Sequence, residues 1–477
     1  MEKDTLQQEK KQLSLIRQLR DFGIGPIIGM MISMLTVPVT TRLLSPEDYG
    51  KSSLFTLFQS LFLIIGLLGI DQGYVRFYND KKIEKDKLLQ NSLFLPFCFS
   101  VFLILVCILF FKPISVFLFG SLEIGLMISF SFFIPILLLN RFFLLQIRMD
   151  LRGKLYSLLN VVSQIINFLI LLLFLIFYQK SFRAIVYATI VGMIVNTAVI
   201  FVFIDKSFIK SKISVSKELQ KQLLKFSLPL VPATLLSWLL NSFDKIGLRT
   251  WSNFEELGLY AAAFKIVALL NVFQSIFTTA WVPIAYKWRE DNVSNKRFEQ
   301  VSTVVLSIMT CLFSFIVVFR DFIMLFLGNE YRNTSSIFVF LLFVPVMYTI
   351  SETTCLGISF SKKTMYNLYV SILAVVLNLI GNYLLIPTYG ALGAAVSTCV
   401  SYVAFFWGRT LFSRRHWFKF KLSKYLINQI LLLIFGVNML VWKNKLVEIF
   451  IFILVLCYNI KLVYPIIIDI KGVKNEN

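Results

Sequence analysis

The sequence predicts an all-α polytopic membrane protein with about 14 transmembrane helices, and three observations lead to this fold class. Hydrophobic residues make up 57% of the chain and the mean hydropathy is +0.77, whereas apolar residues make up about 45–50% of soluble domains. The apolar residues gather in stretches of about 17–25 residues, the length of a helix that crosses a bilayer. Between these stretches, Lys and Arg are enriched in every second segment.

The apolar spans follow one another along the whole chain after a charged start. Several contain proline, such as Pro26 and Pro38 in the first span and Pro229 and Pro232 in the seventh. Such breaks are tolerated inside a helix bundle, where neighbouring helices satisfy the freed carbonyls. The predicted spans are residues 22–41, 53–71, 88–111, 122–145, 155–178, 183–204, 226–248, 257–281, 301–319, 333–351, 365–387, 390–410, 425–442 and 446–464.

The basic residues predict the orientation of these spans. One side of the predicted membrane carries 35 of the 47 Lys and Arg residues and the other carries ten, while Lys245 and Lys265 lie within spans. Basic residues near span ends resist translocation, so the rich side is predicted to be the cytoplasm, with both termini on it. We therefore expect a multi-pass protein of a bacterial cytoplasmic (inner or plasma) membrane.

Composition and motifs argue against several function classes. The net charge of +21 follows from the loops and suits anionic membrane lipids as partners, so no nucleic acid is expected. The six cysteines stand singly, and the single histidine, His416, leaves no histidine triad or multi-histidine metal site. A Walker lysine motif and a sizeable outer loop for a glycosyltransferase or polymerase are also missing from the sequence. We expect no enzyme activity, no catalytic residue, no metal and no cofactor.

An internal repeat predicts that the chain divides into two lobes. Gly50 and Gly258, Gly120 and Gly328, and Lys154 and Lys362 stand in similar local sequences, and each pair is 208 positions apart. Six spans per repeat is an even number, so the two lobes should have the same orientation and be related by a parallel pseudo-two-fold axis. The expected organisation is a cytoplasmic leader (1–21), an N-terminal lobe (22–204), a basic cytoplasmic linker (205–225), a C-terminal lobe (226–410), a basic cytoplasmic loop (411–424), and two extra C-terminal helices with a tail (425–477).

Several motifs resemble one known family. The runs Thr41–Gly50, Phe226–Pro232, Leu257–Lys265 and Gly390–Ala395 are similar to segments of the polysaccharide-biosynthesis flippases, which export O-antigen or capsule repeat units. These flippases belong to the multidrug/oligosaccharidyl-lipid/polysaccharide exporter superfamily. The resemblance implies a two-lobed bundle that moves an undecaprenyl-diphosphate-linked oligosaccharide from the cytoplasmic to the outer leaflet. It also implies polysaccharide polymerase and glycosyltransferases as partners. Lys245 departs from the family pattern, which more often has Arg there.

Three charged residues within the predicted C-terminal lobe are the main substrate-binding candidates. Asp244 and Lys245 lie near the outer end of the seventh span, and Lys265 lies at a similar depth in the eighth. A charge within the hydrocarbon costs roughly 2.5 kcal/mol or more, so it normally faces water or a partner. Two interpretations stay open: a cationic patch for a lipid diphosphate beside a carboxylate that titrates, or an ion pair of Asp244 with a lysine that only joins helices. The positions one repeat earlier carry no charge: Thr36, Val37 and Leu57.

Charged residues at span ends give further candidates. Arg42 ends the first span and either lines the outer mouth or extends to the interface. Asp71 and Arg76, at the cytoplasmic end of the second span, form either an entry gate or an ordinary interfacial ion pair. Polar residues within spans fit either sugar hydroxyls or interhelical hydrogen bonds: Asn160, Gln164, Asn167, Asn241, Asn271, Gln274 and Asn378.

Together these observations predict an exporter that works by alternating access, coupled to an H⁺ or Na⁺ gradient, to the membrane potential or to removal of its product. Three alternatives remain open from the sequence. The first is a drug or metabolite cation antiporter of the same fold, the second is a flippase for a lipid-linked peptidoglycan precursor, and the third is a structural membrane protein without transport. A cation antiporter needs a membrane carboxylate that exchanges its cation for protons, whereas a diphosphate sugar needs a cationic lumen.

Overall fold

The computed structural model describes residues 25, 27–29, 31–32, 34–212 and 214–475, and regular structure among these residues is helical throughout. Within the described part of the chain, twelve helical segments are long and apolar enough to cross a membrane, and a shorter apolar helix runs over Ile27–Leu43. The predicted fold class, an all-α multi-pass membrane protein, is confirmed. The predicted leader (1–21) lies outside the described residues.

The predicted number of fourteen spans stays a prediction. The eleventh and twelfth predicted spans belong to one helical run, α18 (Met365–His416), which is interrupted at Gly390 by a non-helical backbone with φ 53° and ψ −131°. Only glycine adopts such angles readily, so Gly390 divides α18 into two legs, Met365–Tyr389 and Ala391–His416. The first predicted span falls partly outside the described residues.

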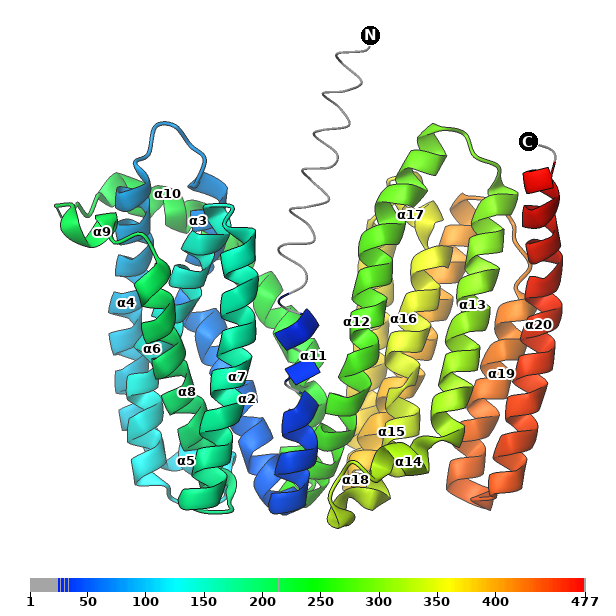
Figure 1. Ribbon diagram of the computed structural model, residues 1–477, viewed down its shortest axis with the longest axis horizontal. Helices are drawn as coiled ribbons and strands as arrows, with labels where there is room; N and C mark the ends of the chain where they lie inside the picture. Colours follow the sequence, from blue (N-terminus) through cyan, green and yellow to red (C-terminus); the bar gives the residue numbers. More distant parts are fainter. Residues whose placement is uncertain (1–24, 26, 30, 33, 213, 476–477) are drawn as a thin grey trace, which may run out of the picture. The chain divides into compact units, whose positions relative to one another are not determined.

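The chain divides into two compact units, Met1–Phe243 and Asp244–Asn477. The boundary falls within α11, 18 residues beyond the predicted start of the C-terminal lobe, and the predicted lobes remain a proposal. In unit 1, neighbouring helices include α4 with α6, α6 with α8, α7 with α8, and α2 with α8 (Figure 1). The helices of unit 1 are α2 (Pro46–Leu67), α3 (Ile70–Phe77), α4 (Lys85–Leu109), α5 (Phe111–Phe119), α6 (Ile124–Met149), α7 (Gly153–Phe177), α8 (Phe182–Phe203), α9 (Ser207–Lys210), α10 (Lys217–Ser227), η1 (Leu228–Leu230) and the first part of α11 (Val231–Trp251).

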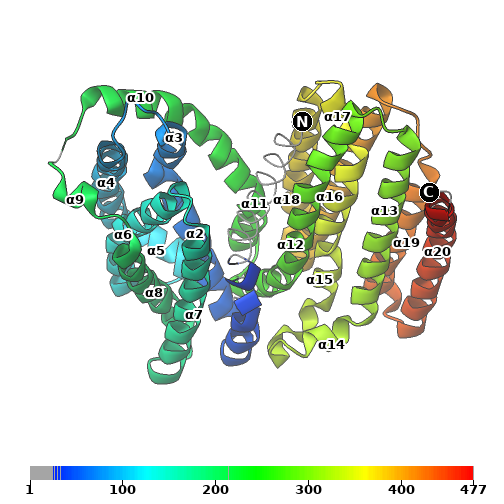
Figure 2. The same cartoon turned by 45° about the horizontal axis from the view of Figure 1, so that its top comes forward.

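Unit 2 contains most of the second predicted repeat and the last two long helices. Both α19 and α20 pack against α13, as Figure 2 also shows. The C-terminal pair is therefore part of the folded unit. The helices of unit 2, after the end of α11, are α12 (Phe254–Glu290), α13 (Asn295–Val318), α14 (Arg320–Met324), η2 (Asn329–Thr334), α15 (Ser335–Leu341), α16 (Phe343–Thr354), α17 (Leu356–Phe360), α18 (Met365–His416), α19 (Ser423–Val437), η3 (Asn438–Trp442) and α20 (Lys445–Asn475).

The helix boundaries repeat at the offset that the sequence predicts. Ser45 caps α2 by accepting from the Asp48 backbone N–H at 3.2 Å, and Asn253 caps α12 by accepting from the Glu256 N–H at 2.9 Å. The two capping residues, Ser45 and Asn253, are 208 positions apart, and so are the two N–H donors, Asp48 and Glu256. A side-chain oxygen that satisfies a free N–H of the first turn fixes where a helix begins. The helices α2 and α12 therefore begin at equivalent positions of the predicted repeat.

Aromatic side chains fill the core of each unit. In unit 1, Phe55 packs edge-on against Phe130 with ring centroids 5.3 Å apart. In unit 2, the rings of Phe298 and Trp417 pack edge-on with their centroids 5.1 Å apart, in a cluster between α12, α13 and α17. Edge-to-face pairs of this kind stabilise a packed interior beyond the burial of their area.

Candidate functional site

Asp244, on α11, lies in a cluster of neutral hydrogen-bond donors. Its Oδ2 accepts from the Tyr260 hydroxyl at 2.5 Å and from the Thr398 hydroxyl at 2.8 Å. Its Oδ1 accepts from the side-chain amides of Asn382 at 2.6 Å and Asn378 at 3.2 Å. We call these five residues the Asp244 cluster. Its members come from α11, α12 and both legs of α18.

The donors of the Asp244 cluster are themselves connected and mostly buried. Asn378 also donates to Thr398 at 3.1 Å, and Asn382 donates to the Asn378 side-chain oxygen at 3.1 Å. Tyr260, Asn382 and Thr398 are buried, with 2%, 0% and 5% of their surfaces exposed. The Oδ1 atom of Asn382 is buried and has no hydrogen-bond partner among the described residues. A connected network of this kind fixes the position of the carboxylate.

The cluster satisfies Asp244 without a cation. Asp244 is half-buried, and a carboxylate partly withdrawn from water is costly unless it is paired or hydrogen-bonded. Four neutral donors meet that need here. Asp244 is therefore held in place by neutral groups of α12 and of both legs of α18.

The two predicted lysines stand near this carboxylate. Lys245 is the next residue on α11, is half-buried, and interacts electrostatically with both Asp244 and Lys265. Lys265 lies on α12, five residues after Tyr260, and its side chain is exposed. The structure thus brings together three predicted site residues, Asp244, Lys245 and Lys265. Whether they bind substrate or have a structural role stays a proposal.

The predicted gate residues do not pair with each other. Asp71, on α3, is buried, and its Oδ2 accepts from Arg141 of α6 at 2.9 Å and from Gln72 at 3.1 Å. Arg76 is exposed near the end of α3. The ionic partner of Asp71 is therefore Arg141, which the sequence pattern alone could not identify because α6 is distant in sequence. Arg42 is exposed at the end of the Ile27–Leu43 helix of unit 1.

Sequence reasoning missed three members of the Asp244 cluster: Tyr260, Asn382 and Thr398. Asn378 was recognised only as one of several polar residues within spans. Asn378 and Asn382 are four positions apart and so lie on one helical face, which is a signal that the sequence contains. Tyr260 and Thr398 carry no such signal, since a single hydroxyl in an apolar span commonly bonds to its own helix.

A second carboxylate secures the corner of α18 next to the cluster. Glu256 of α12 accepts the backbone N–H of Ala391 at 2.7 Å, the first N–H after the break. A Cβ at Gly390 would lie 2.4 Å from the Glu256 Oε2, so a larger residue does not fit without displacing the carboxylate. Glu256 therefore caps the second leg of α18, which carries Thr398, against α12, which carries Tyr260.

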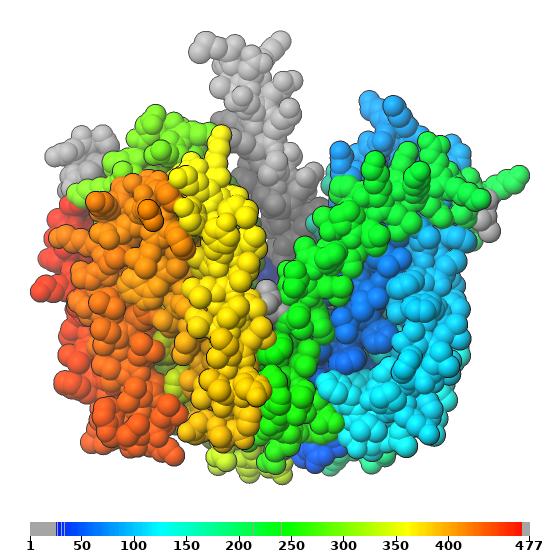
Figure 3. Space-filling model, turned by 180° about the vertical axis from the view of Figure 1, so that it is seen from behind, coloured from blue at the N-terminus to red at the C-terminus, as the bar shows by residue number. Residues whose placement is uncertain are grey.

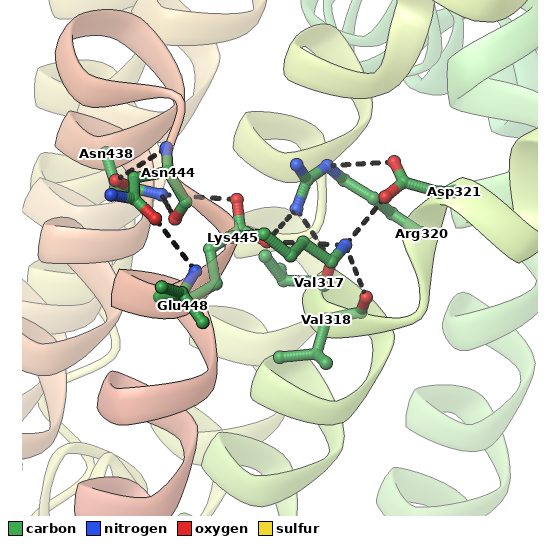
Figure 4. Close-up of polar contacts among 9 residues, drawn as sticks. Val317, Val318, Arg320, Asp321, Asn438, Asn444, Lys445 and Glu448 are labelled. Atoms are coloured by element: carbon green, nitrogen blue, oxygen red, sulfur yellow. Dashed lines mark hydrogen bonds and ion pairs between the residues drawn. The ribbon is translucent and has the colours of Figure 1, made fainter.

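Buried ion pairs elsewhere in unit 2 join its helices. Glu448 of α20 is fully buried and accepts from Arg320 of α14 at 2.5 Å, while Lys445 donates to Asp321 at 2.7 Å (Figure 4). Asn438, after α19, donates to Glu448 at 3.2 Å. This group fastens the C-terminal pair of helices to the end of α13. Because every charge has a partner within the protein, its arrangement is that of a structural site.

Other carboxylates in unit 2 are also paired. Arg409 of α18 donates to Glu352 of α16 at 2.7 Å, and Lys424 of α19 donates to Glu299 of α13 at 2.8 Å. Among the described residues no group of three or more His, Cys, Asp or Glu is arranged to bind a metal ion. Asp244, by contrast, accepts hydrogen bonds from neutral donors on α12 and on both legs of α18.

Comparison with known proteins agrees with the predicted resemblance. The family model described as "Polysaccharide biosynthesis protein" matches residues 23–288. A protein named probable low-salt glycan biosynthesis flippase Agl15, from Haloferax volcanii, is 23% identical over 464 residues, with 92% of this chain and 93% of the relative covered. The capsular polysaccharide biosynthesis protein CapF of Staphylococcus aureus is 21% identical over 401 residues, covering 81% and 96% of the two chains.

Solved structures show the same fold. The lipid II flippase MurJ, in an inward closed conformation, aligns with a TM-score of 0.68 and 19% identity, covering 95% of this chain and 100% of MurJ. An inward-facing multidrug resistance transporter of the MATE family aligns with a TM-score of 0.58 and 18% identity, covering 83% and 97%. At these identities the alignments establish the fold alone.

Proposed function

We propose, since this chain belongs to the family of polysaccharide biosynthesis proteins, that it is a flippase for undecaprenyl-diphosphate-linked oligosaccharide units. It moves these units from the cytoplasmic to the outer leaflet by alternating access, for assembly of a cell-surface polysaccharide such as a capsule or O-antigen. The glycosyltransferases that build the unit act before it, and the polymerase that joins the units acts after it. The names of Agl15 and CapF support a glycan substrate.

The observation that carries this proposal is the position of Lys245 and Lys265 beside the Asp244 cluster. Asp244 already accepts four hydrogen bonds from neutral groups, so it does not require either lysine as a hydrogen-bond donor. Lys245 and Lys265 thus bring two positive charges close to this carboxylate, and together they attract a substrate that carries negative charge. A lipid diphosphate has that charge, whereas a cationic drug would be repelled.

The Asp244 cluster is the proposed coupling site. A carboxylate with hydroxyl and amide neighbours binds either a proton or a sodium ion, because hard cations prefer oxygen ligands. The unpartnered Oδ1 of Asn382 supplies one further oxygen at this place. Occupation of the site by H⁺ or Na⁺ would change the hydrogen bonds between α11, α12 and both legs of α18. A gradient could thereby act on the helices that carry the two lysines.

Two alternatives are separated from this proposal by experiment. The fold similarity to MATE transporters leaves a drug or metabolite cation antiporter as one of them, and the similarity to MurJ leaves a peptidoglycan-precursor flippase as the other. Deletion of the gene should cause lipid-linked oligosaccharide to accumulate in the cytoplasmic leaflet, measured by leaflet-resolved labelling of lipid-linked sugars. Unchanged lipid-linked sugar with raised sensitivity to cationic drugs would instead identify the antiporter. Accumulation of the peptidoglycan precursor alone would identify the other flippase.

A further inference from the structure

The helix α10 (Lys217–Ser227) has two opposite faces. The buried side chains are those of Leu219, Leu223 and Ser227, and they face α3 and α4. The exposed residues Lys217, Lys221 and Lys225 recur every four positions, which places them in one row on the opposite face of the helix. Over eight residues this row spans about 12 Å. We call these three residues the α10 lysine row.

Close backbone contact seats α10 on α3. Gly69 has φ 70°, and a Cβ there would lie 2.7 Å from the Ser227 carbonyl oxygen. A Cβ at Gly73 would lie 2.6 Å from the Ser227 Oγ. Both distances are too short for a side chain, so the two glycines permit the contact. They also flank Asp71, whose carboxylate bonds to Arg141, so α10 rests directly on the helix that carries this ion pair.

The segment before α10 is attached to α4 by side-chain amides. Gln90 donates to the Phe208 carbonyl at 2.6 Å and accepts from the Ser214 N–H at 3.0 Å. Asn91 donates to the Ser214 carbonyl at 2.8 Å and accepts from the Ser216 N–H at 2.9 Å. Backbone groups of a loop that are paired in this way have few alternative conformations. The α10 lysine row is therefore presented from a fixed position on unit 1.

The surroundings of the α10 lysine row indicate what it meets. Among the described residues none forms an ion pair with Lys217, Lys221 or Lys225. Directly after the row the chain exposes apolar side chains, with Phe226 at 37% and Leu228 at 52%, and continues into α11. Figure 3 shows α9 and α10, in green, on the outside of unit 1. A change from cationic to apolar exposed residues is typical of the headgroup region of a bilayer.

We propose that the α10 lysine row is a docking surface for anionic phospholipid headgroups of the leaflet on that side, which is predicted to be the cytoplasmic one. Basic residues beside a membrane helix attract anionic lipids through the negative surface potential. The occupant is a bulk anionic lipid such as phosphatidylglycerol, because the three lysines are exposed and their charge attracts any anionic headgroup. Through Ser227 the bound leaflet then supports α3 and its Asp71–Arg141 pair.

The test measures lipid selectivity of the full-length protein in nanodiscs of phosphatidylcholine with added phosphatidylglycerol. Spin-labelled phosphatidylglycerol and phosphatidylcholine report the immobilised fraction of each lipid. In the K217Q/K221Q/K225Q variant, the preference for phosphatidylglycerol should fall about tenfold, since each lysine near the surface adds attraction. High salt should reduce the preference of the wild type in the same direction.

Two further variants make the result specific. K217R/K221R/K225R preserves the charge and should preserve the preference for phosphatidylglycerol. K81Q/K82Q/K419Q removes the same charge from three exposed lysines elsewhere and should change the preference less than twofold, by the weak contribution of scattered charges. Equal loss in both glutamine variants would overturn the proposal in favour of a general charge effect. An unchanged preference in K217Q/K221Q/K225Q would overturn it in favour of a merely solvated face.

The diphosphate of a lipid-linked substrate is the other anion that this surface could meet. Added undecaprenyl diphosphate should not displace spin-labelled phosphatidylglycerol from the wild type more effectively than phosphatidylglycerol itself does. Preferential displacement would overturn the assignment to bulk lipid and show a substrate-capture site. None of these measurements requires flipping activity, so the result stands whether or not the proposed function is correct.

Discussion

Equivalent positions of the two units differ in chemistry although their helices follow the same order. The residues of the Asp244 cluster are Asp244, Tyr260, Asn378, Asn382 and Thr398, and 208 positions earlier stand Thr36, Ser52, Ile170, Phe174 and Ile190. Around Ile170 and Phe174, unit 1 forms an apolar core with Leu171 and Leu175. Unit 2 thus carries a carboxylate network, whereas the counterparts of its two asparagines in unit 1 pack in an apolar core. A duplicated helix framework preserves its helix starts and leaves the interior free to specialise.

The corners between the last two helices of each repeat differ in the same way. In unit 2, Glu256 accepts from the backbone of α18 at its break. In unit 1, α7 and α8 are separate helices, and Arg183 of α8 forms two hydrogen bonds with Glu123, at 2.6 and 3.0 Å. Unit 2 therefore fixes its corner through the backbone, and unit 1 through side chains. This difference indicates that the angle between the two legs of α18 is more constrained than the angle between α7 and α8, because Asn382 and Thr398 must both reach Asp244.

The largest expected effects concern Asp244. D244A would leave four donors without their acceptor, and D244N retains the shape but removes the charge. Hydrogen bonds to a charged group contribute about 1.5–3 kcal/mol, so flipping should slow about tenfold in D244N and more in D244A. Export of the polymer and membrane level of the protein are measured together. The exposed Asp321 provides the control, and a D321N variant that loses as much export as D244N would contradict a special role for Asp244.

Stability should differ between the ion pairs of the two units. Removing one partner of a buried ion pair costs about 3–5 kcal/mol of stability, so R320M or E448Q alone should destabilise the protein strongly. The double variant R320M/E448L should lose much less stability than the two single losses added together. The Arg141–Asp71 pair has an arginine side chain 41% exposed, and R141M should cost about 1 kcal/mol. Unfolding in detergent measures the loss of stability for each of the two ion pairs. Similar losses for R320M and R141M would remove this distinction between the units.

The two lysines beside the Asp244 cluster give the next effect. K245Q and K265Q should each lower export about fivefold, the scale of about 1 kcal/mol for one charge interaction. The fold-loss of export in K245Q/K265Q should be smaller than the product of the two single fold-losses, because both lysines would act on one diphosphate. K245R and K265R retain the charge and should retain more export. Normal export in K245Q/K265Q would leave only a structural role for these lysines.

The smallest effect tests the corner of α18. Cys399 is buried beside Thr398, so its rate of alkylation reports movement of the second leg. With the other cysteines replaced, E256A should raise that rate about fivefold, the effect of losing a cap worth about 1 kcal/mol. In E256Q the glutamine side chain can still accept a hydrogen bond from the Ala391 N–H, so this variant should raise the alkylation rate of Cys399 less than E256A does. The equivalent residue in unit 1, Asp48, supplies the control D48A. A rate in E256A no higher than in D48A would refute the positioning role of Glu256.

Much of the fold could be predicted from the sequence because it depends on local signals. Apolar stretches of bilayer length predicted the helices, and the motifs around Gly50 and Gly258 predicted a repeat. The caps of α2 and α12 stand at the offset of that repeat, while the two lobes stay a proposal. The break at Gly390 was not predicted as a bend within one helical run, since Gly and Pro also mark ordinary loops. The number of spans depends on such breaks.

The candidate site was predicted only in its charged residues. Asp244, Lys245 and Lys265 are conspicuous because charges are rare within apolar spans. Tyr260 and Thr398 were missed because their role depends on contacts across 16 and 154 positions of sequence. Arg141 was not predicted as the partner of Asp71, because this contact joins α6 to α3 across 70 positions of sequence. Pairings between distant helices are set by packing, which local pattern does not encode.

The most direct test of the central claim is transbilayer movement of an undecaprenyl-diphosphate-linked oligosaccharide in liposomes that contain the purified protein. The account predicts that wild-type protein accelerates the movement over protein-free liposomes, and that D244N retains about a tenth of that acceleration. The conservative change I170V, at the apolar counterpart of Asn378, should leave the rate unchanged. No acceleration by the wild type would contradict the flippase, and equal loss in D244N and I170V would contradict the assignment of the chemistry to unit 2.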